Sequence, residues 1–173
     1  MKKFILVVSL SLFALNSYSQ FHISTGVGIP TGDIKDFSSY QINLGATYML
    51  ESESDFKVGL SASYVRFFGK KDADYANEDY EDLSWFPLAA VINYSLSDNF
   101  SIGTNVGYAI GVYPDYLEGG FYLLPNIGYS ISDKIALKMS YSMISISSGT
   151  DSSGYEYASS SISNIGLGVA FQL

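Results

Sequence analysis

The sequence contains no cysteine, one histidine, one tryptophan and only four prolines in 173 residues. The absence of cysteine excludes disulfide frameworks, thiolate metal sites and thiol nucleophiles. A single histidine, His22, excludes a Ser-His-Asp constellation anywhere else in the chain. Charged residues make up 15% of the sequence, whereas soluble globular domains contain roughly 25%. The composition therefore leaves little room for conventional hydrolytic or metal chemistry.

The N-terminus has the pattern of a secretory signal peptide. Lys2 and Lys3 form a short basic region, the apolar run FILVVSLSLFAL follows, and small residues lead up to Ser19. The run is too short to span a membrane as a helix. We therefore predict that residues 1–19 are a cleaved signal peptide and that residues 20–173 form one mature domain.

Beyond the signal peptide, apolar residues alternate with small or polar ones, which is the two-residue period of a β-strand. In the stretch FSIGTNVGYAIG, for example, Phe100, Ile102 and Tyr108 share one face, while Ser101 and Gly103 share the other. We predict eight strands, at residues 20–29, 39–50, 56–67, 83–96, 100–112, 119–131, 135–147 and 158–173. Pro87 and Pro125 fall within two of them, and we expect a β-bulge at each because proline cannot donate to the ladder.

The less apolar face of these strands decides between two architectures. A soluble lipocalin-like barrel carries charge outside and apolar groups inside, whereas a transmembrane barrel reverses this order. The second face is built mainly of Gly, Ser, Asn and Ala, and we find charge there only at Lys57 and Lys138. Small residues suit a narrow lumen rather than a water-facing surface. We predict an all-β fold, an eight-stranded antiparallel up-and-down transmembrane β-barrel, with a soluble periplasmic barrel as the alternative.

Aromatic residues on the apolar face recur at a shared interval. Five strands carry a pair separated by eight residues, which corresponds to about 27 Å along a strand. A tilt of about 40° reduces this to roughly 21 Å across the membrane, close to the apolar band of outer-membrane barrels. We predict two aromatic girdles, formed by the pairs Tyr40 and Tyr48, Phe56 and Tyr64, Phe86 and Tyr94, Phe100 and Tyr108, and Phe121 and Tyr129.

The connections between strands alternate in length. Short ones at 51–55, 97–99 and 132–134 alternate with long ones at 31–39, 69–82, 113–119 and 147–157. Outer-membrane barrels have short periplasmic turns and longer extracellular loops. We therefore predict an integral protein of the cell outer membrane with extracellular loops and with both termini in the periplasm.

The whole mature chain resembles the small eight-stranded outer-membrane barrels of the OmpX, OmpA-barrel and opacity-protein type, and especially PorT-like outer-membrane barrel domains. Its last strand is similar to the family's assembly signal, although Gln172 and Leu173 follow the final aromatic residue. The resemblance implies recognition by the barrel-assembly machinery and a lipid and lipopolysaccharide environment. The matching residues are Asn164, Gly166, Val169 and Phe171.

Other candidate sites are weaker. We expect His22 to face the lumen at the periplasmic end, far from where a lipid A deacylase would need it. Arg66 follows Tyr64 on the lipid face, where it could contact a lipopolysaccharide phosphate or extend along the rim without a specific partner. The glycines of STGVGIPTGD lack the following helix and lysine of a phosphate loop, so they predict a strand and a turn. Carboxylates that could bind a divalent cation occur in the second long loop, at Asp72, Asp74, Glu78 and Asp79, but their spacing is not that of an EF-hand.

The function expected from the sequence is non-enzymatic, without a cofactor. The net charge of −8 becomes −10 when Lys2 and Lys3 are removed, which disfavours nucleic acid as a partner. The acidic, tyrosine-bearing loops favour surface contact with an extracellular or envelope protein, or a role in envelope integrity. The alternatives are a narrow porin-like channel, a PorT-like accessory of secretion and, least favoured, a lipid A-modifying enzyme.

Overall fold

The computed structural model describes residues 20–50, 54–71, 80–147, 149–150, 156–157 and 159–173. The predicted signal peptide lies outside these residues. Within them, no helix is long and apolar enough to cross a membrane. The elements in chain order are β1 (Gln20–Gly32), the 3-10 helix η1 (Asp33–Asp36), β2 (Ser38–Met49), β3 (Phe56–Gly69), β4 (Leu83–Ser95), β5 (Phe100–Tyr113), β6 (Gly120–Ser132), β7 (Ile135–Ile146), β8 (Gly149–Thr150), β9 (Glu156–Tyr157) and β10 (Ser160–Gln172).

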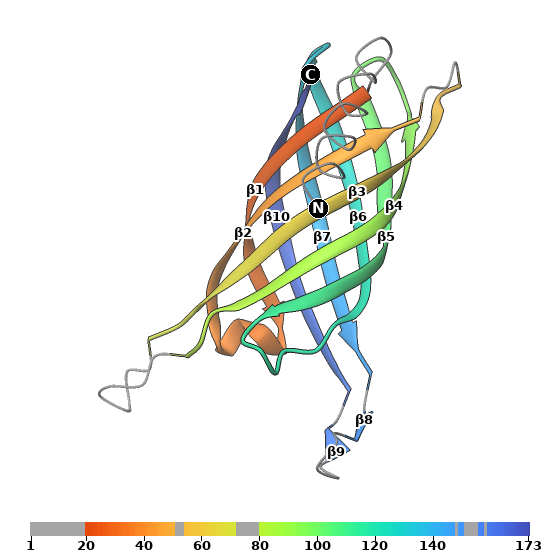
Figure 1. Ribbon diagram of the computed structural model, residues 1–173. Helices are drawn as coiled ribbons and strands as arrows, with labels where there is room; N and C mark the ends of the chain where they lie inside the picture. The colour runs from red at the N-terminus through yellow and green to blue at the C-terminus, as the bar shows by residue number, and fades with distance from the viewer. Residues whose placement is uncertain (1–19, 51–53, 72–79, 148, 151–155, 158) are drawn as a thin grey trace, which may run out of the picture.

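Eight long strands close into one antiparallel barrel in the order β1-β10-β7-β6-β5-β4-β3-β2 (Figure 1). The last strand pairs with the first from His22 opposite Gln172 to Gly32 opposite Ile162, so the barrel has no open edge. The eight predicted strands are confirmed, each within three residues of its predicted bounds. The short η1 helix and the two-stranded β8-β9 ribbon were not predicted, because their sequences carry no periodic pattern.

The two ends of the barrel differ. One end, here called the turn end, holds the short connections and both the start of β1 and the end of β10. The opposite end, the loop end, holds η1, the connections that follow β3 and β5, and the β8-β9 ribbon, which projects beyond the barrel (Figure 1). The long and short connections therefore segregate to opposite ends, as the sequence predicted.

The predicted bulges at the two prolines are wrong. Pro87 pairs in register with Ala109, and Pro125 pairs in register with Thr104. On the other side of each proline the ladder has a gap, but the register is the same before and after it. A missing N–H removes one bond to one neighbour without inserting a residue, so no bulge is required. The register shifts lie instead between Ser38 and Tyr40, Ser84 and Trp85, and Ser130 and Ser132.

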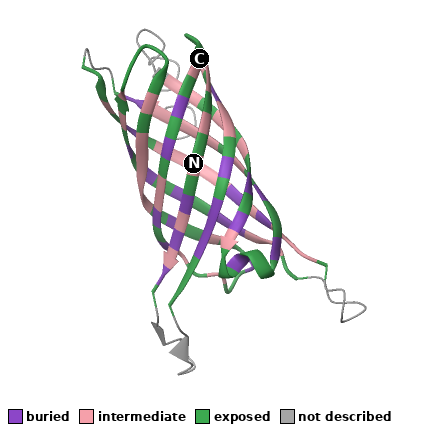
Figure 2. Cartoon of the chain, turned by 180° about the vertical axis from the view of Figure 1, so that it is seen from behind, coloured by how far each residue is buried: buried purple, intermediate pink, exposed green. Residues whose placement is uncertain are grey.

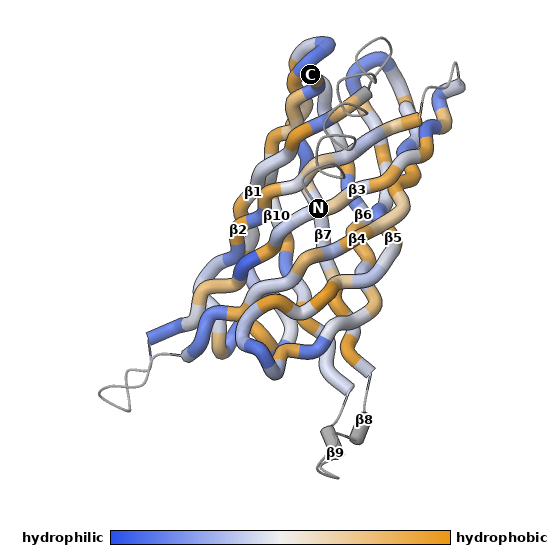
Figure 3. Tube along the Cα trace, viewed as in Figure 1, coloured by the Kyte–Doolittle hydropathy of each residue, from blue (hydrophilic) through white to orange (hydrophobic). Residues whose placement is uncertain are grey.

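The outer face of the barrel is apolar and exposed on every strand. Burial alternates along the strands in Figure 2, and hydropathy alternates with it in Figure 3. A soluble monomer rarely exposes a continuous apolar surface larger than a few hundred Å². The barrel therefore needs an apolar medium around it. Exposed apolar or aromatic side chains, one from each of the eight strands, are Val27, Leu44, Leu60, Leu88, Tyr108, Ile127, Met139 and Leu167.

The inner face differs from the sequence prediction, which described it as mainly Gly, Ser, Asn and Ala. At the loop end a hydrophobic cluster fills the lumen around Phe67, Trp85, Tyr122 and Ile144, and η1 adds the buried Ile34. The middle of the lumen carries amides and hydroxyls, such as the buried Asn164, which donates to the Ser142 hydroxyl at 2.6 Å. An eight-stranded barrel is just wide enough for side chains to fill, and here large apolar ones fill one end.

Two glycines shape the loop end. Gly32 ends β1 with φ of 65°, a left-handed conformation that turns the chain into η1. The STGVGIPTGD stretch is thus a strand and a turn, as predicted, and not a phosphate loop. Gly111 lies opposite Trp85, and a Cβ there would come within 1.9 Å of the Leu117 carbonyl oxygen. Its missing side chain lets the β5-β6 connection close over Trp85, whose indole N–H donates to the Glu118 carbonyl oxygen at 3.0 Å.

Substitution of Gly111 by alanine should therefore loosen this end of the lumen. We expect Gly111→Ala to lower the free energy of unfolding in urea by about 1–3 kcal/mol, the usual cost of overpacking. Trp85 is the only tryptophan in the chain, so its emission should shift to the red as water reaches the indole. Gly166→Ala is the matched control, because its Cβ would meet no atom closer than 3.3 Å. Equal effects of the two substitutions would contradict the close approach at Gly111.

Candidate functional site

An ion pair clamps the second long connection onto the barrel rim at the loop end. Arg66, near the end of β3, donates to one Asp82 carboxylate oxygen through Nη2 at 2.7 Å and through Nε at 3.2 Å. The other carboxylate oxygen of Asp82 accepts the Gly69 backbone N–H at 2.9 Å. The guanidinium also lies over the Phe68 ring, 5.3 Å from its centroid. These contacts fix the ends of β3 and of the segment that leads into β4.

The Asp82 carboxyl has a lowered pKa. Partial burial raises the pKa, but the hydrogen bonds from Arg66 and from the Gly69 backbone N–H outweigh it and hold the pKa below its ordinary value. Arg66 and Asp82 form the only ion pair among the described residues. Because both side chains remain partly exposed, with 39% and 29% of their surface accessible, the pair stabilises the rim only modestly.

The first and second long connections are joined directly. The Lys70 backbone N–H donates to the Phe37 carbonyl oxygen at 2.8 Å, and the Lys70 ammonium donates to the Lys35 carbonyl oxygen at 2.6 Å. The Tyr80 ring meets the Phe37 ring edge to face, with centroids 5.2 Å apart. Both rings nevertheless remain more than 40% exposed. The two connections therefore present one shared aromatic surface.

The third long connection joins the second through a tyrosine. The Tyr116 hydroxyl donates to the Glu81 carboxylate, and this hydrogen bond raises the pKa of Tyr116. Tyr116 is nevertheless 74% exposed. Together with the indole bond from Trp85 to Glu118, this contact fixes the connection against the barrel mouth. Three connections that are distant in sequence thus form a single layer.

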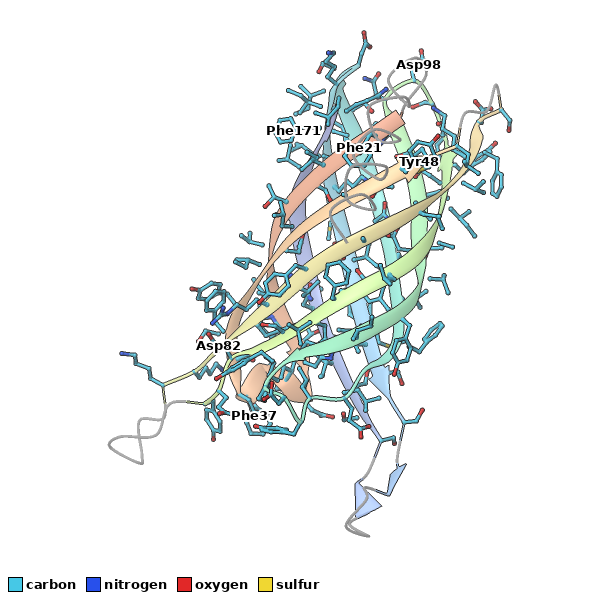
Figure 4. All side chains as sticks on the ribbon, viewed as in Figure 1. Phe21, Phe37, Tyr48, Asp82, Asp98 and Phe171 are labelled. Atoms are coloured by element: carbon cyan, nitrogen blue, oxygen red, sulfur yellow. The ribbon has the colours of Figure 1, made fainter. Side chains whose placement is uncertain are left out.

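We call this layer the loop-end surface. Figure 4 shows Phe37 and Asp82 together at this end of the barrel, opposite Asp98 at the turn end. The surface combines exposed aromatic rings, which supply contact area at low entropic cost, with exposed carboxylates. Its aromatic members are Phe37, Tyr80, Tyr113 and Tyr116, and its acidic members are Asp33, Asp36, Glu81, Asp115 and Glu118.

Solved structures share this fold. A de novo designed transmembrane β-barrel gives a TM-score of 0.54 at 12% identity, over 88% of this chain and 94% of the design. The chain has the fold of small outer-membrane barrels. The attachment invasion locus protein Ail of Yersinia pestis gives 0.54 at 10% identity, over 90% and 97% of the two chains. Neisserial surface protein A gives 0.51 at 12% identity, over 90% and 98%. No protein-family model and no curated protein sequence matches the chain.

In this outer-membrane-type barrel the ten aromatic residues predicted as girdles all lie in the outward phase of their strands. Tyr48 and Tyr64 are half-buried, and the Tyr64 hydroxyl donates to the Ser84 hydroxyl at 2.9 Å. The other eight are exposed, namely Tyr40, Phe56, Phe86, Tyr94, Phe100, Tyr108, Phe121 and Tyr129. The outward phase suits the predicted girdles, whose contact with the two membrane interfaces stays a prediction.

The ladder shows which of these residues lie side by side on neighbouring strands. The eight-residue spacing predicts that Phe86 and Tyr94 of β4 belong to opposite girdles, and the ladder places Tyr94 directly opposite Phe56 of β3 near the turn end. The same end holds Phe100 opposite Tyr129, with ring centroids 4.9 Å apart. Antiparallel pairing causes this grouping, because it brings the start of one strand beside the end of the next.

Aromatic residues also meet across strands near the loop end. Tyr108 of β5 lies opposite Phe121 of β6. Tyr40 of β2 lies opposite Phe68 of β3, and their rings stack with centroids 4.5 Å apart. Phe68 was not among the residues predicted for the girdles, because no second aromatic residue follows or precedes it by eight positions in the outward phase of β3. The outer face therefore carries cross-strand aromatic pairs at both ends of the barrel.

The barrel separates the other predicted site residues. His22 lies at the turn end and lines the lumen there, away from the loop-end surface. Arg66 is on the outer face but is engaged by Asp82, so its predicted contact with lipopolysaccharide stays a prediction. The possible cation ligands Asp72, Asp74, Glu78 and Asp79 lie outside the described residues, and within the described part no cluster of acidic or histidine side chains suits a metal ion.

The residues of the predicted assembly signal lie on β10, where successive side chains point alternately into the lumen and outward. Asn164 and Gly166 face the lumen and are buried, whereas Phe171 is exposed on the outer face beside Ile23 of β1. Sequence reasoning missed the residues that join the long connections, because Tyr116 and Glu81 are 35 positions apart and share no motif. Recognition by the assembly machinery remains a prediction.

The ion pair between Arg66 and Asp82 predicts that the stability of the protein depends on pH. Because the folded pKa of Asp82 is lowered, its stabilisation is present above the unfolded pKa of about 3.9 and is lost as the pH falls through the folded value. We expect Asp82→Asn to unfold more easily than the wild type at pH 7, by about 0.2–1 kcal/mol. The difference should vanish in acid, which urea unfolding at several pH values measures. Asp36→Asn, at an exposed position of η1, controls for the loss of one negative charge. A difference that persists unchanged in acid would contradict the assignment.

Proposed function

We propose that the protein is an integral, non-enzymatic outer-membrane barrel whose loop-end surface binds a partner outside the cell. Membrane insertion is supported by the exposed apolar side chains on all eight strands, because exposing so large an apolar surface to water is energetically unfavourable. The cross-strand aromatic pairs near both ends suit the two interfaces between lipid and water. The orientation is supported by the difference between the two ends, because outer-membrane barrels keep short turns in the periplasm and long loops outside.

The absence of cysteine makes this orientation directly testable. We expect Asp115→Cys, at the loop end, to react on intact cells with a maleimide that cannot cross membranes. Asp98→Cys, at the turn end, should react only after lysis. The exposure of both side chains makes them a matched pair, and labelling of the denatured protein serves as the control for thiol reactivity.

The opposite labelling pattern would reverse the orientation. Recovery of the protein with soluble periplasmic contents, rather than with the outer membrane, would reject membrane insertion altogether. These two outcomes are independent, since fractionation reads location and labelling reads sidedness.

The proposal that the protein is not an enzyme rests on the position of its single histidine, His22. A deacylase acting on lipid A needs its histidine near the outer rim and toward lipid, whereas His22 lines the lumen at the turn end. The loop-end surface offers carboxylates, phenols and one arginine that is already paired with Asp82. None of these arrangements supplies an activated nucleophile with its base.

The surface chemistry favours a basic partner. The carboxylates of the loop-end surface outnumber the nearby cations, and the second long connection adds Asp72, Asp74, Glu78 and Asp79 to the same region by sequence. The structure of Ail in complex with the heparin analogue sucrose octasulfate has the same fold, but a sulfated ligand does not suit an acidic surface. We therefore infer a protein partner with a basic, aromatic-accepting face rather than a sulfated glycan.

A channel and a secretion accessory are the weaker alternatives. A channel needs a continuous polar path, and the cluster around Trp85 and Phe67 fills the lumen at the loop end. A PorT-like role in secretion is carried only by the resemblance of the sequence. The aromatic and acidic surface built from three connections is the observation that favours binding.

Removal of the exposed rings should abolish the surface function. We expect the combined variant Phe37→Ser, Tyr80→Ser, Tyr113→Ser and Tyr116→Ser to behave like a gene deletion in adhesion and envelope-integrity assays, with about a tenfold or greater loss of any surface binding. The control carries Asp98→Ser and Lys134→Ser at the turn end. Both variants must reach the outer membrane at wild-type levels. Unchanged binding by the first variant would reject the loop-end surface as the site.

A further inference from the structure

Two lysines point into the lumen of an otherwise acidic protein. Lys57 is on β3 and Lys138 is on β7, and both side chains line one cavity of about 240 Å³ at the turn end. In the closed strand order, four steps separate β7 from β3 in either direction around the barrel. The two lysines therefore project from opposite walls toward the same space.

Neither lysine has a carboxylate partner among the described residues. The only ion pair in that part of the chain is the one between Arg66 and Asp82 at the far end of the barrel. The one acidic side chain that lines the cavity, Asp98, lies at its mouth on the turn between β4 and β5 (Figure 4). A charged group removed from bulk water is costly unless a counter-charge or ordered water compensates it. The cavity thus has an excess of positive charge.

The barrel wall around Lys138 leaves space for its side chain. Both cross-strand neighbours of Lys138 are glycines, Gly168 on β10 and Gly128 on β6. Because these neighbours have no side chains, the long lysine stem can cross the wall without displacing another group. Around it the cavity is lined by groups that donate or accept hydrogen bonds, including Asn93, Asn126 and Ser101.

The cavity lies at the turn end of the lumen. It opens at the turn end, while the cluster that contains Phe67, Trp85, Tyr122 and Ile144 closes the loop end. An ion that enters from the turn end therefore meets this packed apolar cluster before it reaches the loop end. The arrangement has the properties of a binding chamber and not of a conduction path.

We propose that this chamber binds a compact, multiply charged oxyanion of the phosphate or sulfate class between Lys57 and Lys138. A tetrahedral oxyanion offers acceptors in several directions, so it can meet ammonium groups from two opposed walls at once. The cavity is smaller than the roughly 300–1,000 Å³ of pockets for drug-sized ligands. It suits an inorganic anion, or a single phosphate group, and excludes a whole nucleotide.

Calorimetric titration of the refolded barrel with sodium phosphate tests the proposal. The barrel is held in a maltoside detergent, which contains no phosphate, and sodium chloride at matched ionic strength corrects for screening. We expect saturable phosphate binding by the wild type. Lys138→Met and Lys57→Met should each raise the dissociation constant at least about tenfold, as expected when one charge-assisted contact is lost. Sodium sulfate in a parallel titration tests whether the chamber accepts the whole class.

The control is Lys134→Met, which removes the same charge from an exposed turn beside the chamber. Its affinity should stay within about twofold of the wild type. Lys138→Arg keeps the charge and should retain binding, which separates loss of charge from a fault in folding. Absence of saturable binding by the wild type would overturn the proposal. Equal affinity in the wild type and in a Lys57→Met, Lys138→Met double variant, or an equal loss with Lys134→Met, would also overturn it.

Discussion

The closed ladder is the constraint on which the rest of the structure depends. Where no water is available, each backbone N–H and C=O group must find its partner within the sheet. Here β10 returns to pair with β1 along almost its whole length, so no strand edge is left open. Closure with eight strands sets a narrow diameter. A narrow diameter in turn forces side chains of the inner face to share a small space, which explains why glycine recurs there.

Closure also explains why the strands could be predicted from the sequence. Once every barrel strand separates an inside from an outside, a two-residue period must run through all of them, and it does so in the eight strands of the barrel. The strands and the outer aromatic residues such as Tyr94 and Phe100 could be predicted because each depends only on local alternation. Their partners could not, since the residue opposite Tyr94 is fixed by the register between β3 and β4. The lysines of the lumen were predictable from alternation alone, since Lys57 and Lys138 are in the inward phase.

The loop end could not be predicted in this way. Its surface depends on contacts such as Tyr116 with Glu81 and Trp85 with Glu118, which join residues more than 30 positions apart. The large apolar side chains of the lumen were a missed signal, because Trp85 and Phe67 are in the inward phase and alternate with Phe86 and Phe68. The prediction of bulges at Pro87 and Pro125 was wrong for a different reason. A proline can interrupt one ladder and leave the register intact, so its presence does not identify a bulge.

The apolar cluster beneath η1 limits how the two ends of the barrel can influence each other. If the barrel spans a membrane as proposed, the turn-end cavity exchanges solutes with the compartment on its own side, and its contents follow the composition of that compartment. The loop-end surface, by contrast, lies on the other side of that cluster. The two ends are therefore separated inside the lumen by packed side chains around Trp85, although a single sheet connects them. Any influence of one end on the other has to travel through the strands themselves and not through the lumen.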